Sequence, residues 1–345
     1  MTQGQMDIES WMGDIRRHVD VILERFFESK CDEATRLSPQ AIELVTEVRD
    51  LTMRGGKRLR PIVTAAAYRA ASGATDLAPT FEVGAALELL QTYLLIHDDW
   101  MDEDDERRGG PAVHYAFQEK HRDTHLGASL GILAGDLAST FGWELLLGGR
   151  FPEGRRDEGL TLFVKIQKEV FAGQQLDLMT DGDVERMHDL KTGSYTTRGP
   201  AELGGILADA DAASMRSLHD WAAPLGVAFQ LRDDLLGTFG NVQQTGKPGD
   251  DLRHGKHNAV VAAFRRLGPS EAERAVLGGV WGRADATDEE VLAATQVLTA
   301  AKREVDTRLG FLADEARDAL AASAFDDGAK QVLEEVTRRL TDRGT

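Results

Sequence analysis

The apolar residues of this chain recur at steps of three or four over long stretches, which is the spacing of one face of an α-helix. Within residues 83–100 they are Val83, Leu87, Leu90 and Leu94. The same spacing recurs over residues 163–179, 221–236 and 292–316. No alternating pattern long enough for a half-buried strand is present in the sequence. The sequence therefore predicts an all-α fold, a bundle of helices.

Segments rich in glycine or proline separate these periodic stretches and predict short connections between helices. They are Gly109-Gly110-Pro111, residues 148–154, Gly199-Pro200 and residues 246–249. Proline is scarce, with 9 in 345 residues, and no Ser-, Gly- or Pro-rich tract forms a linker. We therefore expect a single domain over residues 1–345, with disorder confined to about 1–15 and 341–345.

The formal net charge of −18 argues against a general nucleic-acid-binding protein and against binding to an anionic membrane surface. Cys31 is the single cysteine, so no disulfide can form within the chain, which fits a reducing cytoplasm. The opening MTQGQMDIES lacks the basic and apolar regions of a signal peptide. We expect no run long enough to span a bilayer, and hence no stable membrane insertion.

An acidic motif, Asp98-Asp99-Trp100-Met101-Asp102, closes the apolar helix predicted over residues 83–100. On a helix Asp98 and Asp102 are one turn apart, and Asp99 and Asp102 are also neighbours. Three carboxylates on one edge repel one another unless a hard divalent cation such as Mg²⁺ lies between them. A solvated helix end is the alternative for this motif taken alone.

A second motif, residues 230–237 (QLRDDLLG), closes the helix predicted over residues 221–236. Gln230, Asp233 and Asp234 lie on one face of that helix. A single Asp-Asp pair is weak evidence and fits a surface cap. Two such pairs, each ending an apolar helix, suit a substrate with an anionic head and a hydrocarbon tail.

Cationic residues accompany glycine turns in three places, which suits binding of phosphate groups. Lys57, Arg58 and Arg60 follow Gly55-Gly56. Arg107-Arg108 follows the first acidic motif, and Lys247 and Lys256 follow the second. Lys191-Thr192 lies in a polar stretch of its own. Each cluster alone also fits an ordinary surface turn.

Taken together and in order, these segments resemble the trans-isoprenyl diphosphate synthases of the polyprenyl synthetase family, and most of all the short-chain geranylgeranyl and farnesyl diphosphate synthases. The segments are GGKRLRP, HDDWMDEDDERRGGPAVH, Gly135-Asp136, KTGSYT, FQLRDDLLGTFG and TGKPGDDLRHGK. The resemblance extends from about residue 40 to the end of the chain. It implies an isoprenoid-synthase bundle around a central apolar cavity, a homodimer, and condensation of isopentenyl diphosphate with allylic diphosphates.

The resemblance also implies roles for matching positions. Catalysis would involve Asp98, Asp99, Asp102, Lys191, Asp233 and Asp234. Three Mg²⁺ ions are implied, two on Asp98 and Asp102 and one on Asp233, with Asp251 supporting and Gln230 and Asp234 assisting. The allylic diphosphate would be held by Arg107, Lys191, Thr192, Lys247 and Lys256. Isopentenyl diphosphate would be held by Lys57, Arg60, Gln91 and Arg108.

The chain departs from the family pattern at three places. Gly237 stands where many members have an aspartate, Gln91 replaces a histidine, and His257-Asn258 replaces a pair such as Arg-Thr. The metal ligands named above are unaffected.

The length of the product is expected to depend on the first-motif helix. Leu94 and Leu90 lie one and two turns before Asp98, and Tyr93 holds the place of an aromatic residue that limits growth in the family. This predicts a C20 product, geranylgeranyl diphosphate. C15 farnesyl diphosphate is the second choice, and C25 stays open.

Three alternatives remain at this point. A class I terpene cyclase also ionises prenyl diphosphates, but it needs no site like GGKRLRP for a second diphosphate. A non-catalytic synthase subunit would tend to lose acidic motifs. A helical scaffold with acidic patches would bind neither magnesium nor diphosphate.

Overall fold

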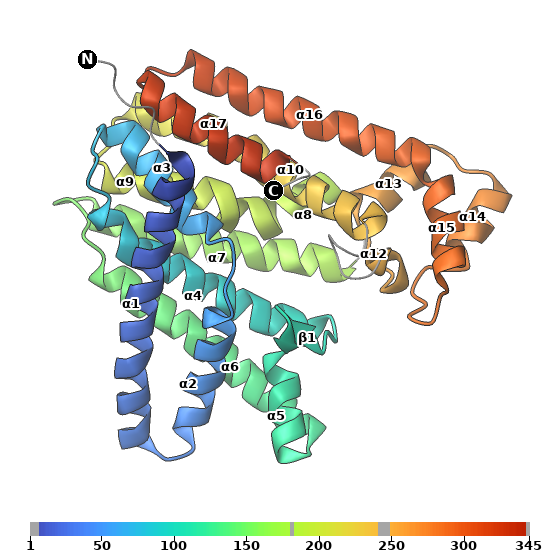
Figure 1. The fold of residues 1–345 in the computed structure, drawn as a ribbon, viewed down its shortest axis with the longest axis horizontal. Coiled ribbons are helices and arrows are strands. Elements are labelled where there is room, and N and C mark those ends of the chain that lie inside the picture. Colours follow the sequence, from blue (N-terminus) through green and yellow to red (C-terminus); the bar gives the residue numbers. More distant parts are fainter. Residues whose placement is uncertain (1–6, 180–182, 241–248, 343–345) are drawn as a thin grey trace. The chain divides into compact units, whose positions relative to one another are not determined.

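The protein is described here from a computed structural model covering residues 7–179, 183–240 and 249–342. Almost all of the regular structure is helical, which confirms the predicted all-α class (Figure 1). The chain forms two compact units, Met1–Thr161 with Glu202–Ala210, and Leu162–Ala201 with Asp211–Thr345. The single-domain organisation and the central cavity stay predictions.

The first unit contains α1 to α6 and a short β-hairpin. Its elements are α1 (Ile8–Leu37), α2 (Ala41–Met53), α3 (Leu59–Ser72), α4 (Ala78–Met101), β1 (Glu106–Arg107), β2 (Gly110–Pro111), α5 (Val113–His121) and α6 (Thr124–Gly148). Figure 1 shows α1 and α2 as an antiparallel pair joined by a turn. In α4 the periodic residues Val83, Leu87 and Leu90 are fully buried, as their spacing predicts, and α4 packs along α6.

The second unit is built around α10. Its elements are α8 (Val184–His188), the π-helix η1 (Asp189–Arg198), α10 (Ala212–Phe239), α12 (Asp250–Arg253), α13 (Ala259–Arg266), α14 (Glu271–Gly278), α15 (Asp288–Val297), α16 (Thr299–Ala322) and α17 (Asp327–Thr341). Two further helices, α7 (Arg156–Met179) and α9 (Gly199–Leu207), contribute residues to both units. Trp221 of α10 is fully buried, and its Nε1 donates to Oγ1 of Thr337 at 2.9 Å.

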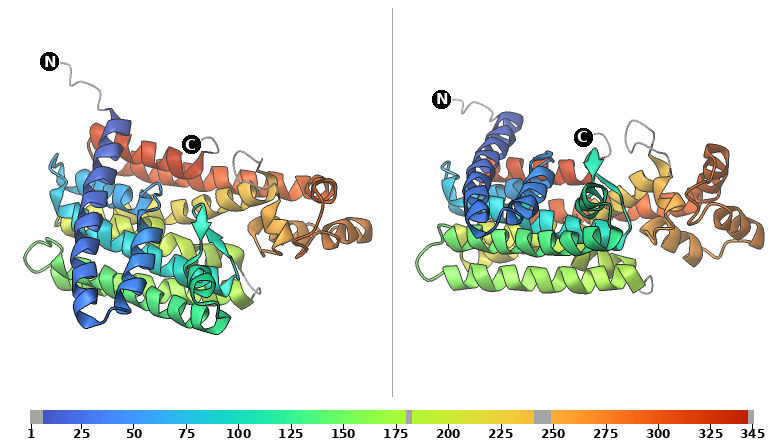
Figure 2. Two further views of the ribbon diagram at one scale, coloured as in Figure 1. Left: turned by 60° about the horizontal axis from the view of Figure 1, so that its bottom comes forward. Right: turned by 90° about the horizontal axis from the view of Figure 1, so that it is seen from below.

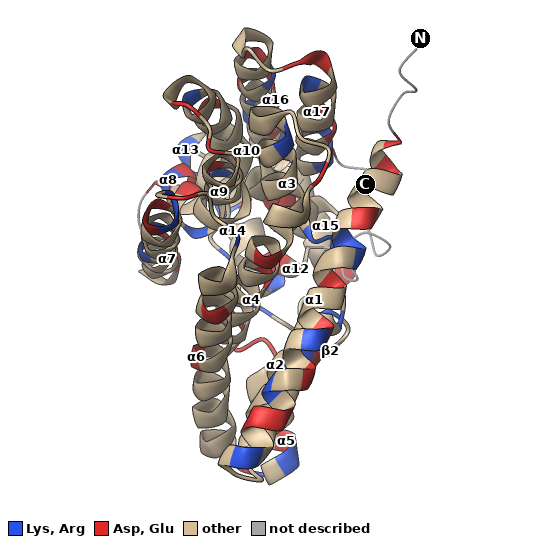
Figure 3. Cartoon of the chain, turned by 90° about the vertical axis from the view of Figure 1, so that its left-hand side faces the viewer, with Lys and Arg blue, Asp and Glu red and all other residues tan. Residues whose placement is uncertain are grey.

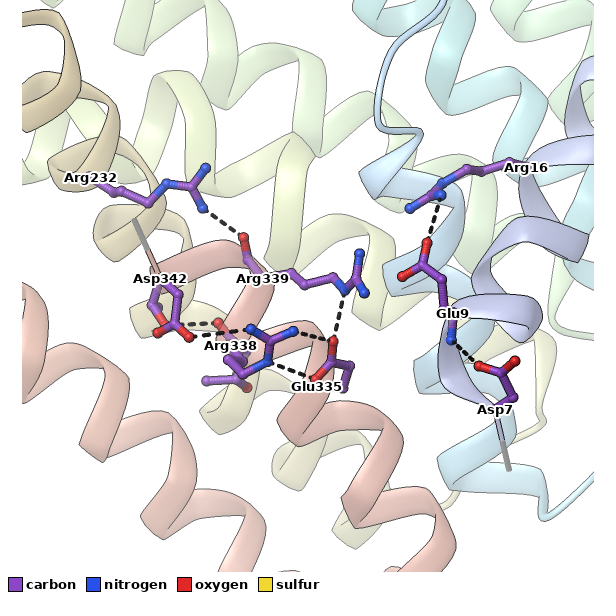
Figure 4. Close-up of polar contacts among 10 residues, drawn as sticks. Asp7, Glu9, Arg16, Arg232, Glu335, Arg338, Arg339 and Asp342 are labelled. Atoms are coloured by element: carbon purple, nitrogen blue, oxygen red, sulfur yellow. Dashed lines mark hydrogen bonds and ion pairs between the residues drawn. The ribbon is translucent and has the colours of Figure 1, made fainter. Parts of the chain in front are cut away.

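The end of the second unit is fixed by charged side chains. Figure 4 shows Arg338 and Arg339 both directed at Glu335, and Arg232 of α10 directed at the carbonyl of Arg339. In the first unit, Arg16 of α1 is directed at Glu9 in the same view, with 3.5 Å between Nη1 and Oε1.

Two details of the predicted helices are wrong. The continuous helix expected over residues 292–316 breaks at Leu298, between α15 and α16. The Thr299 hydroxyl there donates to the carbonyl of Gln296, a local bond that competes with the helix ladder. The break expected at Gly199-Pro200 is absent, because Gly199 has helical φ and ψ and Pro200 lies in the first turn of α9, where proline is tolerated.

The expectation that no segment has the length and composition of a membrane span is also wrong. By these two criteria alone α6 qualifies, since Asp136 and Glu144 are its only Asp, Glu, Lys or Arg residues. Figure 3 shows it as a largely uncharged helix, in contrast to α1. Buried helices of soluble proteins pass the same test, and α6 packs against both α4 and α5 in its unit.

Candidate functional site

The first acidic motif lies at the end of α4, as predicted. Asp102 caps the helix and its N–H donates to the carbonyl of Asp98 at 2.8 Å. Asp98 and Asp102 are half-buried, whereas Asp99 is fully buried. Asp99 therefore has different surroundings from the other two carboxylates of the motif.

Asp99 is paired with Arg107, which comes from the hairpin that follows α4. Nε of Arg107 donates to Oδ1 of Asp99 at 2.6 Å, and Nη2 contacts the same oxygen. Burial raises the pKa of Asp99 to about 6, although the Arg107 guanidinium favours its charged form. Oδ2 of Asp99 is buried and has no hydrogen-bond partner among the described residues.

The hairpin is the local structure that returns Arg107 to Asp99. Glu106 pairs with Pro111 and Arg107 with Gly110, around a two-residue turn in which Arg108 and Gly109 are both left-handed. Such a turn matches the twist of paired strands. Figure 2 shows the hairpin next to α5.

Cationic side chains gather where the GGKRLRP segment meets this hairpin. Nη1 of Arg108 donates to the carbonyl of Leu51 at 3.3 Å, and Gly56 lies directly against the Arg108 guanidinium. Burial lowers the pKa of Arg108, and the neighbouring guanidinium groups of Arg58, Arg60 and Arg107 lower it further, against the opposing effect of the Glu88 carboxylate. This mutual repulsion is what a bound anion relieves. Of the other predicted residues, Lys57 is exposed, and Gln91 is half-buried on α4.

The sequence did not predict the buried ion pair between Arg58 and Glu88, which lies next to these cationic side chains. Arg58 is left-handed at φ 48° and lies directly before α3. Its guanidinium donates to Oε2 of Glu88 at 2.8 Å, to Oδ1 of Asp20 at 2.9 Å and to the carbonyl of Thr52 at 2.9 Å. Only the helical position of Glu88, a charged residue on the apolar face of α4, could have indicated it.

The residues expected to limit product length lie along α4. Leu90 is fully buried, Tyr93 is 9% exposed, and Leu94 is half-buried. The Tyr93 ring makes an edge contact with His97, with 4.9 Å between centroids. His97 in turn lies against Gly135 of α6, where a Cβ atom would come within 2.2 Å of Nε2. Gly135 thus leaves room for the His97 ring beside α6.

In the second unit, the second acidic motif lies on α10 near its end, as predicted. Asp233 is half-buried, and Asp234 is buried. Oδ2 of Asp234 accepts from the N–H of Ala259 at 2.8 Å and lies 3.3 Å from Nε2 of His188. Asp234 therefore connects α10 to the start of α13 and to α8, a holding role that the sequence did not reveal.

Gln230 and Thr192 are brought together with this carboxylate. Nε2 of Gln230 donates to Oδ1 of Asp234 at 3.1 Å, and the Thr192 hydroxyl donates to Oε1 of Gln230 at 3.0 Å. Thr192 and Lys191 lie in η1, and π-helical turns of this kind are frequent at functional sites. Nζ of Lys191 lies 2.5 Å from Oδ2 of Asp177 on α7.

Asp177 was missed from the sequence, where it lies within a helical pattern and belongs to neither Asp-Asp motif. Of the remaining predicted residues, Asp251 lies in α12 and is half-buried, and Lys256 follows that helix and is exposed. Lys247 lies outside the described residues.

The donor set of the two motifs suits Mg²⁺, which prefers carboxylate oxygens and retains room for substrate phosphates. Within residues 7–179, 183–240 and 249–342, no group of three or more His, Cys, Asp or Glu side chains is arranged to hold a metal ion. Asp98 and Asp102 in one unit, and Asp233 in the other, are the half-buried carboxylates of the motifs.

Comparison with known proteins identifies the family. Residues 42–298 match the polyprenyl synthetase family. The chain is 32% identical to the short chain isoprenyl diphosphate synthase of Methanocaldococcus jannaschii, over 74% of this chain and 76% of that one. It is 33% identical to the farnesyl diphosphate synthase of Geobacillus stearothermophilus, over 73% and 83%.

A solved structure extends the likeness to nearly the whole chain. It is the geranylgeranyl pyrophosphate synthase of Corynebacterium glutamicum, complexed with isoprenyl diphosphate and magnesium. That chain is 29% identical, with a TM-score of 0.88 and coverage of 98% of this chain and 100% of that one. These matches confirm the resemblance drawn from the sequence motifs. The chain belongs to the polyprenyl synthetase family, and it is a trans-prenyltransferase of the isoprenyl diphosphate synthase class.

Proposed function

We propose that this enzyme condenses isopentenyl diphosphate with dimethylallyl, geranyl and farnesyl diphosphates, and that its main product is geranylgeranyl diphosphate. The observation that carries the proposal is that side chains predicted to bind diphosphate contact the buried aspartate of each Asp-Asp motif. Arg107 accompanies Asp99 in the first unit, and Thr192 with Gln230 accompanies Asp234 in the second.

The proposed roles follow this arrangement. Three Mg²⁺ ions would be held by Asp98, Asp102 and Asp233, with Asp251 in support, and would supply the positive charge that stabilises a departing diphosphate. Arg107, Lys191, Thr192, Lys247 and Lys256 bind the allylic diphosphate, and Lys57, Arg60, Gln91 and Arg108 bind isopentenyl diphosphate. Asp99, Asp234 and Gln230 act mainly by orienting these groups, since Asp99 and Asp234 are buried and hydrogen-bonded.

The chemistry assigned to the protein is charge stabilisation and the exclusion of water. Fixed guanidinium and ammonium groups stabilise the negative charge that develops as the allylic C–O bond breaks. Apolar side chains of α4 protect the allylic cation from water until the isopentenyl double bond attacks it. The released diphosphate would accept the proton lost in the final step.

The C20 assignment rests on Tyr93. Its bulky ring is held edge-on against His97. This chain is 33% identical to a farnesyl diphosphate synthase and 31% identical to a geranylgeranyl diphosphate synthase, so overall identity does not distinguish the two products. A C15 product is the second candidate, supported by the same buried aromatic group acting earlier in elongation.

We also propose that the enzyme is a homodimer that uses α6. Four large apolar residues of this helix are exposed in the single chain: Leu126, Ile132, Leu133 and Leu147. A group of large apolar side chains exposed on one helix is typical of a surface that binds another protein. Leu133→Glu is expected to give monomers in analytical ultracentrifugation. Leu292→Glu, at an equally exposed residue of α15, is the matched control and should leave the dimer intact.

The deciding experiment is incubation of the purified protein with isopentenyl diphosphate, each allylic starter in turn, and MgCl₂, followed by chromatographic sizing of the products. A linear C20 diphosphate is expected, and chelation of magnesium should abolish its formation. A cyclic hydrocarbon made from one substrate alone would indicate a terpene cyclase. Absence of turnover by the purified chain would indicate a non-catalytic subunit.

A further inference from the structure

One edge of α7 holds the π-helix η1 over three successive turns, all within the second unit. Oε2 of Glu169 accepts from Nη1 of Arg198 at 2.8 Å. One turn later, Gly173 lies directly against the backbone of Lys191. After a further turn, Oδ2 of Asp177 lies 2.5 Å from Nζ of Lys191. Because residues four apart share one edge of a helix, α7 fixes both the backbone and the side-chain end of Lys191.

An edge of α10 supports the next residues of η1 in the same way. Gly226 lies directly against Cα of Gly193. One turn later, Oε1 of Gln230 accepts from the Thr192 hydroxyl at 3.0 Å. After a further turn, Asp234 accepts from Gln230 at 3.1 Å. Thus α10 fixes the two residues that directly follow the lysine in η1.

The two glycines meet main-chain atoms of η1 so closely that no side chain fits there. A Cβ atom at position 173 would lie 2.2 Å from the backbone nitrogen of Lys191 and 2.6 Å from its Cα. A Cβ atom at position 226 would lie 2.3 Å from Cα of Gly193. Main-chain atoms cannot rotate away as the end of a side chain does. Any side chain at either position must therefore displace η1 itself.

The conformation of η1 depends on such support. It has π geometry over 10 residues, Asp189–Arg198, whereas this geometry mostly appears as single-turn bulges. Its two ends are joined, since Nη2 of Arg198 donates to Oδ1 of Asp189 at 2.9 Å. The Ser194 hydroxyl donates to the carbonyl of Leu190 at 2.6 Å. These local bonds and the two supporting helices together hold the backbone that carries the lysine and the threonine.

We propose that Gly173 and Gly226 are positioning residues for the diphosphate-binding groups of Lys191 and Thr192. Each glycine sets how closely the η1 backbone approaches its helix. The polar side chain one turn later then sets the direction in which the ammonium or hydroxyl group points. Misplacement of a binding group by about 1 Å can cost on the order of 100-fold in rate. The proposal rests on the proposed function of the lysine and threonine, and deepens it by naming residues that act through them.

Magnesium-dependent binding of inorganic pyrophosphate, measured by titration calorimetry in MgCl₂, tests the proposal without a prenyl substrate. Gly173→Ala should weaken this binding by about 10-fold, the order expected for losing one hydrogen bond from a charged group. Gly310→Ala in α16 is the matched control. An added Cβ atom there meets no atom of the described residues within 4 Å, so the pyrophosphate affinity should stay unchanged.

A double-mutant cycle separates positioning from a general loss of packing. In a Lys191→Ala background, Gly173→Ala should weaken pyrophosphate binding further by less than about twofold, because the displaced ammonium group is gone. The melting temperature should still fall by about 2–4 °C or more in both backgrounds, since the overlap with the backbone persists. Additive losses of affinity would overturn the proposal, as would unchanged affinity of a folded Gly173→Ala variant.

Gly226→Ala is an independent second test, and it replaces the first if the Gly173 variant does not fold. Its overlap is with Gly193, so its loss of pyrophosphate affinity should shrink to less than about twofold in a Thr192→Ala background. In a Lys191→Ala background the loss should remain, because the threonine hydroxyl is still present and misplaced. A loss of equal size in the Thr192→Ala background would refute the role of Gly226.

Turnover distinguishes this proposal from the proposed function. Failure of the wild-type protein to elongate an allylic diphosphate would refute the proposed function, whatever the binding cycles show. In an elongating enzyme, Gly173→Ala should lower kcat and raise the KM for the allylic substrate. The KM for isopentenyl diphosphate should change by less than about twofold. An equal rise in both KM values would indicate general loosening of the fold and would refute only the positioning roles.

Discussion

Arg58 donates from Nη1 to Oε2 of Glu88 at 2.8 Å, and both side chains are almost completely buried. Arg58 lies between Lys57 and Arg60, which we assign to isopentenyl diphosphate. Its left-handed backbone and its three acceptors fix the direction in which the segment enters α3. The ion pair therefore connects the fold of α4 to the geometry of a proposed substrate site.

Replacing Glu88 by alanine should be strongly destabilising, because it leaves the Arg58 guanidinium buried without its closest counter-charge. Loss of one partner of a buried pair costs about 3–5 kcal/mol. Urea unfolding measures this cost. In steady-state kinetics, the KM for isopentenyl diphosphate should rise more over its wild-type value than the KM for the allylic substrate does. Glu82→Ala, on the same helix and paired with the exposed Arg150, is the control and should change neither quantity appreciably.

Tyr93→Ala should lengthen the product beyond C20, because it removes the ring proposed to stop chain growth. The measurement is chromatography of the dephosphorylated products. Tyr93→Phe retains the ring and its contact with His97, so it should keep the wild-type product. The truncation should also cost about 3–5 kcal/mol of stability, as for other buried aromatic residues. An unchanged product from the alanine variant would contradict the assignment.

Lys191→Ala should reduce kcat on the order of 100-fold, the usual cost of losing one group that stabilises developing negative charge. Asp177→Asn should have a smaller effect, since it keeps a hydrogen-bond acceptor near the Lys191 ammonium but removes the charge. Stopped assays with saturating isopentenyl diphosphate measure kcat for both variants. Lys165→Ala, an exposed lysine of α7 beside Glu169, is the matched control. Equal kcat for the Lys191 and Lys165 variants would rule out the role of Lys191.

Glu335 gives a pH dependence whose sign follows from its partners. Hydrogen bonds from Arg338, opposed by burial and helped by Arg339, lower its pKa from 4.5 to about 2 (Figure 4). A carboxyl group whose pKa is lowered by folding stabilises the protein above the unfolded value. That stabilisation is lost as the pH falls from about 4.5 to about 2.

Glu335→Gln should therefore lower the free energy of unfolding at pH 7 by about 1 kcal/mol, a value reduced for the partial exposure of both arginines. The difference between variant and wild type should shrink at pH 3.5. Denaturant unfolding at the two pH values gives both numbers. A difference that grows on acidification would mean that the ion pairs do not stabilise the fold.

The helical class, the ends of the two motif helices and the family could all be predicted from the sequence, because each depends on local spacing. Val83, Leu87 and Leu90 are buried as their period requires. Asp99 and Asp102 are both aspartates of one motif, yet Asp99 is fully buried and Asp102 is half-buried. That difference depends on the hairpin that returns Arg107, a contact that local spacing does not encode.

Contacts between segments far apart in the chain explain the remaining differences. In the sequence, Gly237 stands where the family pattern often has an aspartate, and the structure shows the Asp251 carboxylate lying against this glycine. Asn258, noted only as a departure from the family pattern, holds that carboxylate. The break at Leu298 was hidden because the apolar period continues across it.

The hairpin after α4 directs two consecutive arginines to different places. Arg107 reaches back to Asp99, while Arg108 reaches the carbonyl of Leu51 beside Gly56. Inserting or deleting one residue in this turn would shift both guanidinium groups at once. Under the proposed assignment of Arg107 and Arg108 to the two diphosphate substrates, a side-chain replacement here would alter one affinity, whereas a change in loop length would disturb both.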